Sequence, residues 1–252
     1  MSDFERNIAA TRTVGVGRDV AIDAGLRAHM IRVYNYMAGG VALTGVVAWL
    51  TYAMSVTQMG AGSLTLTPFG QALFGGPLFF VVMFAPLALV FFMSFRISSL
   101  SVGAAQALFF FYAALLGLSL ASIFLVYTES SITRVFFISA ASFGALSLWG
   151  YTTQRDLSGM GSFLIMGLVG LIIASLVNIF LKSSGLDWAL SVMGVGIFAG
   201  LTAWDTQKIK EQFDPMDDGS IAGRKAVMGA LSLYLDFINL FLSLLRLMGD
   251  RR

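Results

Sequence analysis

Seven long apolar runs constrain the fold of this chain more than any other feature. Each is close to the ~20 residues that an α-helix needs to cross the hydrocarbon core of a bilayer. Backbone polar groups must be satisfied internally in lipid, which favours helices. The connections are too short to hold a second domain. The sequence therefore predicts an all-α membrane protein, with residues 33–252 as a single seven-helix transmembrane domain. The predicted spans are 33–54, 73–95, 104–127, 135–152, 160–181, 187–209 and 227–247.

Composition supports the lipid bilayer as the main partner and excludes several chemistries. Hydrophobic residues make up 57% of the chain and charged residues 12%, about half the charged share of a typical soluble domain. The chain has no cysteine, so it has no disulfide or thiolate site. Its one histidine, His29, lies outside the predicted spans and cannot build a multi-histidine metal site. A net charge of +2 indicates no nucleic-acid partner.

The amino-terminal segment, residues 1–32, is polar and mixed in charge, and it lacks the apolar core of a cleaved signal peptide. Its last ten residues are expected to form an interfacial helix that leads into the first span. Basic residues set the orientation, because cytoplasmic loops carry an excess of them. If the amino terminus is cytoplasmic, eleven basic residues lie on the cytoplasmic side and five on the other side. Three of those five lie at the carboxyl end, which leaves open whether the last span crosses fully.

Two acidic residues lie within or near apolar runs. Asp205 is near the end of the sixth span and Asp236 is in the middle of the seventh. An ionised carboxylate costs several kcal/mol there unless it is paired or hydrated, so such residues indicate function. Asp205 lies nine residues before Asp214 and Asp236 nine after Val227, on either side of the polar loop 214–226, which is roughly 13 Å along each helix. If the sixth span stays helical through Phe213, the two acids meet at one level on neighbouring helices.

The seventh span also carries a polar stripe. Its members are separated by 3, 4, 3, 4 and 3 residues, the spacing of one helical face. The rest of the span is almost entirely apolar. The stripe is therefore expected to face the bundle interior or a wet cavity. Its members are Gly229, Ser232, Asp236, Asn239, Ser243 and Arg246.

The aspartate pair, Asp205 and Asp236, predicts a proton-sensitive contact. Two carboxylates within hydrogen-bond reach cannot both ionise cheaply, so they share a proton and titrate as a unit. A doubly ionised pair would attract a hard cation such as calcium. Arg96, at the end of the second span, could compete for either acid. The plainer interpretations are a hydrated acid beside Lys208, an inert hydrogen-bonded Asp236 and a snorkelling Arg96.

Three motifs around these residues resemble the Bax inhibitor-1 family, also called the transmembrane Bax inhibitor motif family. The longest is Ser232–Phe241, followed by Leu244–Arg246. The second is Trp204–Ile209 and the third is Gly150–Ser158. With the seven-span layout, the resemblance covers about residues 30–249 and is that of a bacterial member.

The resemblance implies that the last helix lies near the centre of the bundle. It implies that Asp205 and Asp236 form a pH sensor on the cytoplasmic side, and that the sensor closes or opens a calcium leak. The family's arginine latch at the end of the second span falls on Arg96. Some members carry an acid within that span, but this chain has none from Leu73 to Phe95. A multi-pass protein of a bacterial inner membrane follows from the same resemblance.

Two other functions are compatible with the same residues. Some bacterial relatives are linked to membrane-bound proteases, so a non-channel modulator of proteolysis or stress responses is the alternative, with the amino-terminal segment binding the partner. Two membrane aspartates could also serve an intramembrane protease as acid and base. Such enzymes resemble a pattern with glycine before the second aspartate, where this chain has Leu235. The sequence thus predicts no enzyme, no catalytic residue and no cofactor, with calcium or protons as the species that move.

Overall fold

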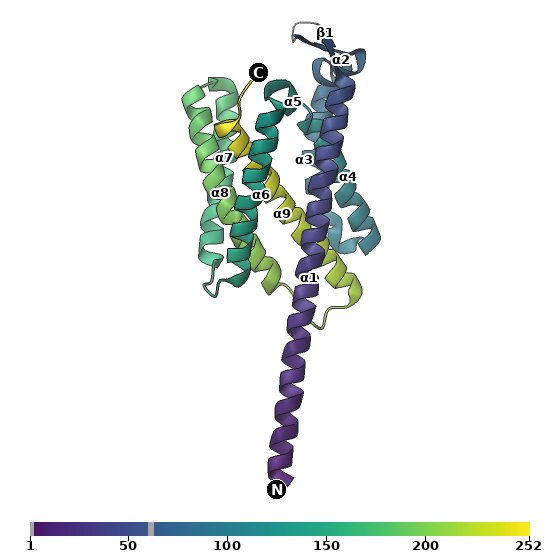
Figure 1. Cartoon of the computed structure of the whole chain (residues 1–252), viewed down its shortest axis with the longest axis vertical. Helices are drawn as coiled ribbons and strands as arrows, with labels where there is room; N and C mark the ends of the chain where they lie inside the picture. The colour runs from purple at the N-terminus through teal and green to yellow at the C-terminus, as the bar shows by residue number, and fades with distance from the viewer. Residues whose placement is uncertain (1–2, 60–62) are drawn as a thin grey trace.

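A computed structural model describes residues 3–59 and 63–252, and the side chains of residues 22–57 and 65–252 (Figure 1). The amino-terminal half contains α1 (Asp3–Ser55), the strands β1 (Val56–Met59) and β2 (Ser63–Leu66), α2 (Pro68–Gly75), α3 (Leu78–Arg96), a 3₁₀ turn η1 (Ile97–Ser99) and α4 (Val102–Leu120). The second half contains α5 (Ile123–Val126), α6 (Glu129–Thr152), α7 (Ser158–Leu181), α8 (Ser184–Glu211) and α9 (Gly219–Met248).

The predicted seven-span bundle is confirmed. The described residues contain seven helical segments that are long and apolar enough to cross a membrane. The last of them, α9, is central: 67% of its most apolar stretch is buried, against 39% or less in every other span. It packs on α8, α1, α6 and α4, and Figure 1 shows it running obliquely across the bundle. A helix surrounded in this way is screened from lipid along most of its length.

The connection between α8 and α9 differs from the prediction. Helix α8 ends at Glu211 and does not continue through Phe213, whose ring packs on His29 at a centroid distance of 5.7 Å. Helix α9 begins at Gly219, eight residues before the predicted span. Asp218 caps it by accepting hydrogen bonds from the backbone N–H groups of Ser220 and Ile221. Asp236 therefore lies more helical turns from this connection than Asp205 does. The two aspartates still come to the same level because α9 runs obliquely across the bundle (Figure 1).

Helix α1 runs without interruption from Asp3 to Ser55. The predicted change at residue 32, from an amino-terminal segment to a first span, is thus not a break in the helix. The first part of α1 extends well beyond the bundle (Figure 1). His29, expected outside the spans, is buried within the long segment Ile22–Ser55 that qualifies as the first span.

The far end of the bundle carries the carboxyl terminus. Helix α9 crosses the whole bundle, so the two chain ends lie at opposite ends of the molecule (Figure 1). The terminus is fastened to the start of α6: the Asp250 carboxylate pairs with Arg134 at 3.0 Å, and the Arg252 backbone N–H donates to the Val126 carbonyl. The same end carries an antiparallel hairpin of β1 and β2, which the sequence reasoning did not anticipate. The carboxyl-terminal basic residues therefore do not mean an incomplete last span.

Candidate functional site

The structure brings the two predicted aspartates together. They lie on α8 and α9, which pack closely on each other. Asp236 is 5% exposed, and its Oδ2 is buried without a hydrogen-bond partner in the part of the chain that is described. Asp205 is half-buried. The two carboxyl groups are close enough to interact as charges and as hydrogen-bonding groups. An unsatisfied carboxyl oxygen beside a second carboxyl is the arrangement in which one proton can be shared.

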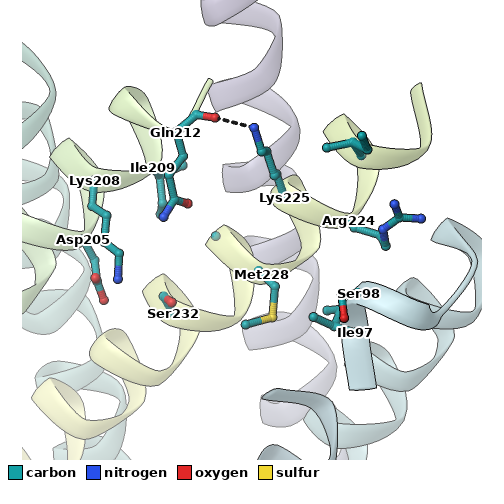
Figure 2. Close-up of a pocket in the computed structure, with 12 residues that line it drawn as sticks. Ile97, Ser98, Asp205, Lys208, Ile209, Gln212, Arg224, Lys225, Met228 and Ser232 are labelled. Carbon is teal, nitrogen blue, oxygen red and sulfur yellow. Dashed lines mark hydrogen bonds between the residues drawn. The ribbon is translucent and has the colours of Figure 1, made fainter. Parts of the chain in front are cut away.

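A cavity of about 550 Å³ reaches Asp205 from the amino-terminal end of the bundle (Figure 2). Ser232, a member of the polar stripe, lies on its wall. Figure 2 shows the Lys208 side chain pointing toward Asp205, on which it acts as a nearby positive charge. Asp205 is therefore the member of the pair that faces this cavity, while Asp236 is enclosed.

The pair by itself offers few ligands for a resident metal. Across the described residues, no group of three or more histidine, cysteine, aspartate or glutamate side chains could hold an ion. Calcium usually takes six to eight oxygen ligands. Two carboxylates would therefore need backbone carbonyls or water to complete the shell, which suits brief occupancy better than permanent binding.

The polar stripe of α9 faces α8 over much of its length. Gly229 lies against Ile209, and Ser243 lies so close to Gly194 that a Cβ added there would be 2.6 Å from the serine Oγ. Asn239 turns back on its own helix and donates to the Leu235 carbonyl. Arg246 is exposed in the last turn of α9. Most of the stripe thus packs against α8, and its end at Gly229 and Ser232 lines the cavity. The stripe does not form a continuous wet channel.

Arg96 is not brought to either aspartate. It ends α3 with an exposed side chain and does not line the cavity that contains Asp205. The arginine on that wall is Arg224, which donates to the Leu100 carbonyl at 3.4 Å. A latch role for Arg96 stays a prediction, and it would require α3 to move relative to α8.

The backbone of α8 beside Asp205 is packed tightly on its neighbours. Gly150 of α6 approaches the Ala203 carbonyl so closely that an added Cβ would lie 2.2 Å from its oxygen. Gly161 of α7 receives the face of the Trp204 indole in the same manner. Side chains larger than hydrogen do not fit at either glycine without displacing α8, so these contacts fix the position of the neighbouring Asp205.

The connection between α6 and α7 is bound to the same segment of α8. The buried Gln207 side chain accepts from the Leu157 N–H and donates to the Arg155 carbonyl, both at 2.8 Å. The Lys210 ammonium donates to the Tyr151 carbonyl at 2.9 Å. Through these contacts, the Gly150–Ser158 motif holds α8 in place. We call this set of contacts the clamp on α8. The roles of Gln207 and Lys210 are not predictable from the motif, because nothing in the sequence says which helix the connection touches.

A chain of hydroxyl groups crosses the bundle at the same level. Tyr34 on α1 bonds to Ser147 on α6 at 2.6 Å, and Ser147 bonds to Thr206 on α8 at 2.9 Å. Thr206 in turn donates to the Thr202 carbonyl of its own helix. Three helices are thereby tied together next to Asp205. The candidate site therefore lies between α8, which contacts with α6 and α7 hold in place, and α9, which runs obliquely across the bundle.

An aromatic layer lies next to the aspartate pair, around Phe237 of α9. The rings of Phe136 and Phe143 lie edge-on to Phe237 at 5.7 and 5.6 Å. The Tyr234 hydroxyl, which is buried, bonds to Thr44 on α1 at 2.6 Å. The side chains named in this layer are aromatic apart from the hydroxyl groups of Tyr234 and Thr44.

The comparisons with known proteins agree with this architecture. A family profile described as "Inhibitor of apoptosis-promoting Bax1" matches residues 26–252. The chain belongs to the Bax inhibitor-1 family. A Rickettsia prowazekii protein, uncharacterized protein RP147, is 46% identical over 254 residues, covering all of both chains. Inner membrane protein YbhL of Escherichia coli K12 is 48% identical over 233 residues, which is 91% of this chain and 94% of that relative. A Caulobacter vibrioides protein is 44% identical over its full length.

Membership in the Bax inhibitor-1 family confirms the resemblance drawn from the three motifs. The motifs fall on the central helix α9, on α8 and on the connection that clamps α8. Together with the seven apolar spans, the match identifies a multi-pass protein embedded in the lipid bilayer.

Proposed function

We propose that this Bax inhibitor-1 family protein is a proton-controlled calcium leak whose gate is the aspartate pair of α8 and α9. The observation that carries the proposal is the buried, unpaired Oδ2 of Asp236 beside the carboxyl group of Asp205. A bare carboxylate in such surroundings is unfavourable unless a proton or a cation satisfies it.

The protonation state of the pair sets the contact between the two helices. With one shared proton, the carboxyl groups attract each other through a hydrogen bond, and α9 stays against α8. When that proton leaves, two like charges face each other in a low-dielectric interior and repel. Because the α6–α7 connection clamps α8 through Gln207 and Lys210, α9 is the helix that moves.

In this proposal, the conformation in which α9 lies against α8 is the closed one. Movement of α9 would displace Phe237 from Phe136 and Phe143 and open the aromatic layer beyond the pair. Two ionised carboxylates then present oxygen ligands to the passing ion. Calcium is the physiological cation that prefers such ligands and exchanges them readily.

The amino-terminal end of the bundle is proposed to face the cytoplasm of a bacterial cell, with the protein in the inner membrane. This end of the bundle carries the larger share of basic residues, including Arg155 in the α6–α7 connection and Lys208 and Arg224 in the adjoining turns of α8 and α9, in agreement with the rule that cytoplasmic loops are positive. YbhL, a relative with 48% identity, is named an inner membrane protein. The proton that controls the pair would then come from the cytoplasm through the cavity at Asp205.

Calcium flux into proteoliposomes tests this function. Wild-type protein should leak calcium to an extent that depends on pH, and Asp236→Asn or Asp205→Asn should remove the pH dependence. Asp187→Asn is the matched control, because it makes the same chemical change in the first turn of α8, away from the pair. A wild-type protein without flux at any pH, or an Asp236→Asn variant with the wild-type pH response, would contradict the proposal.

The alternative is a non-channel modulator of membrane-bound proteolysis, and one observation favours it. The first turns of α1 extend beyond the bundle (Figure 1), where a partner protein could reach them. Deleting residues 1–21 keeps the contacts of His29 with Phe213. A deletion that abolishes the cellular phenotype while flux stays intact would assign the function to this extension. Loss of the phenotype only in the aspartate variants would assign it to the leak.

A further inference from the structure

The cavity at the amino-terminal end is basic to a degree that the leak does not explain. Three cationic side chains line it: Lys208 from the last turn of α8, and Arg224 and Lys225 from the beginning of α9 (Figure 2). Asp205 is the one acidic residue among its lining side chains. A wall with more positive than negative groups repels a metal cation and attracts an anion.

Two of the three cations have no ion-pair partner within 4 Å among the described residues. Lys225 pairs with Asp217 at 2.5 Å and also donates to the Gln212 carbonyl. Lys208 lies over the ring of Trp204. Arg224 makes one long hydrogen bond to a backbone carbonyl, which leaves most of its five donors unused. Arginine with free donors is well suited to the planar, multi-oxygen surface of a phosphate group.

Apolar side chains form another part of the cavity wall. Ile97, Ile221 and Met228 line it beside the cations. The cavity lies over α9, between the end of α3 and the end of α8 (Figure 2). Helix α3 packs on α2 and α4, whereas α8 packs on α6, α7 and α9. Because these spans are long and apolar enough to cross a bilayer, we expect a site at their last turns to lie near the lipid headgroups.

From this combination we infer that the cavity binds the phosphate headgroup of an anionic phospholipid. Arg224 and Lys208 contact the phosphate oxygens, and the start of an acyl chain lies against Ile97 and Met228. Basic pockets between transmembrane helices bind lipid headgroups in this manner. A soluble phosphate would use the cations but would leave the apolar wall without a partner. The binding does not depend on calcium passing through the protein.

Lipid retention measures this binding directly. Purified protein is reconstituted in nanodiscs that contain equal amounts of phosphatidylglycerol and phosphatidylcholine, and the lipids retained after extraction are counted by native mass spectrometry. The wild type should retain phosphatidylglycerol in preference. Arg224→Gln should weaken retention about fivefold, and Lys208→Gln with Arg224→Gln about 25-fold, since each interfacial cation contributes by about that factor. Lys225 is left in place because its ion pair with Asp217 holds the α8–α9 connection.

Arg155→Gln is the matched control. It removes an exposed arginine at the same end of the bundle but outside the cavity, so retention should equal that of the wild type. Equal retention of both lipids by the wild type, or unchanged retention in the double variant, would overturn the inference. Full displacement of bound lipid by soluble glycerol phosphate would also overturn it, because the site would then recognise a free anion. A calcium-flux defect without a change in retention would count against the proposed leak mechanism and not against lipid binding.

Discussion

A single methyl group at Gly150 tests whether the clamp on α8 positions Asp205. The Cβ of Gly150→Ala would lie 2.2 Å from the Ala203 carbonyl oxygen, where distances under 3.0 Å essentially never occur. Because the clashing group is backbone, no side-chain rotation relieves it, and α6 and α8 must separate by roughly 1 Å. A gap of this size forfeits about a quarter to a half of each dispersion contact. Overpacking of this kind costs typically 1–3 kcal/mol.

The matched control for this change is Gly144→Ala on the same helix, where an added Cβ meets nothing within 4 Å. We expect Gly150→Ala to lower the free energy of unfolding by about 1–3 kcal/mol and to shift the pH midpoint of calcium flux. Gly144→Ala should leave both unchanged or gain stability, since alanine favours helix over glycine by up to ~1 kcal/mol. Reversible unfolding in mixed micelles gives the first quantity and proteoliposome flux the second. Equal stability and equal pH midpoints in the two variants would refute the clamp.

Three further changes test separate parts of the account. Gln207→Leu leaves the buried Leu157 N–H and the partly buried Arg155 carbonyl without their partner and should destabilise the fold by about 1–3 kcal/mol in the same unfolding assay; wild-type stability would show that the connection is not anchored there. Tyr234→Phe removes the hydroxyl that bonds to Thr44 and should cost about 0.5–1.5 kcal/mol, which an unchanged unfolding curve would contradict. The backbone N–H of Ile221 lowers the pKa of Asp218, so the cap of α9 is intact above the ordinary pKa of about 3.9 and is lost as pH falls through the lowered pKa. Amide exchange in the first turn of α9 should therefore be faster in Asp218→Ala than in the wild type at pH 6, with the difference vanishing in strong acid; a difference that persists there would exclude a charged cap.

The seven spans were predictable because their lengths and apolar content match a bilayer directly. The early start of α9 was not, since Arg224 and Lys225 make that stretch look like a loop. The sequence does carry a local signal for the start of α9, because Asp218 before Gly219 and Ser220 is a helix-capping pattern. The hairpin of β1 and β2 was missed because two four-residue strands give too short a pattern to separate from a loop.

The aspartate pair was predictable in part. Two acidic residues in apolar runs indicate function because an ionised carboxylate is costly in a membrane. Their position on consecutive helices predicted that they lie together. Their relative depth was not predictable, because α8 ends at Glu211, α9 begins at Gly219, and the sequence does not show the oblique course of α9. The neighbours of the pair depend on packing between α6, α7 and α8. Nothing in the sequence indicates that Gly150 lies against Ala203 or that Arg224, not Arg96, lines the cavity.

The infrared spectrum of the protein in lipid tests the shared proton most directly. The account predicts a carboxylic-acid C=O band at neutral pH. Asp236→Asn should remove this band, because Asp205, which faces the cavity, then has no second carboxyl group with which to share a proton. Asp205→Asn should shift the band, because the hydrogen-bond partner of Asp236 changes. A band that survives Asp236→Asn, or that keeps its frequency in Asp205→Asn, would contradict the claim that the two carboxyl groups hold one proton between them.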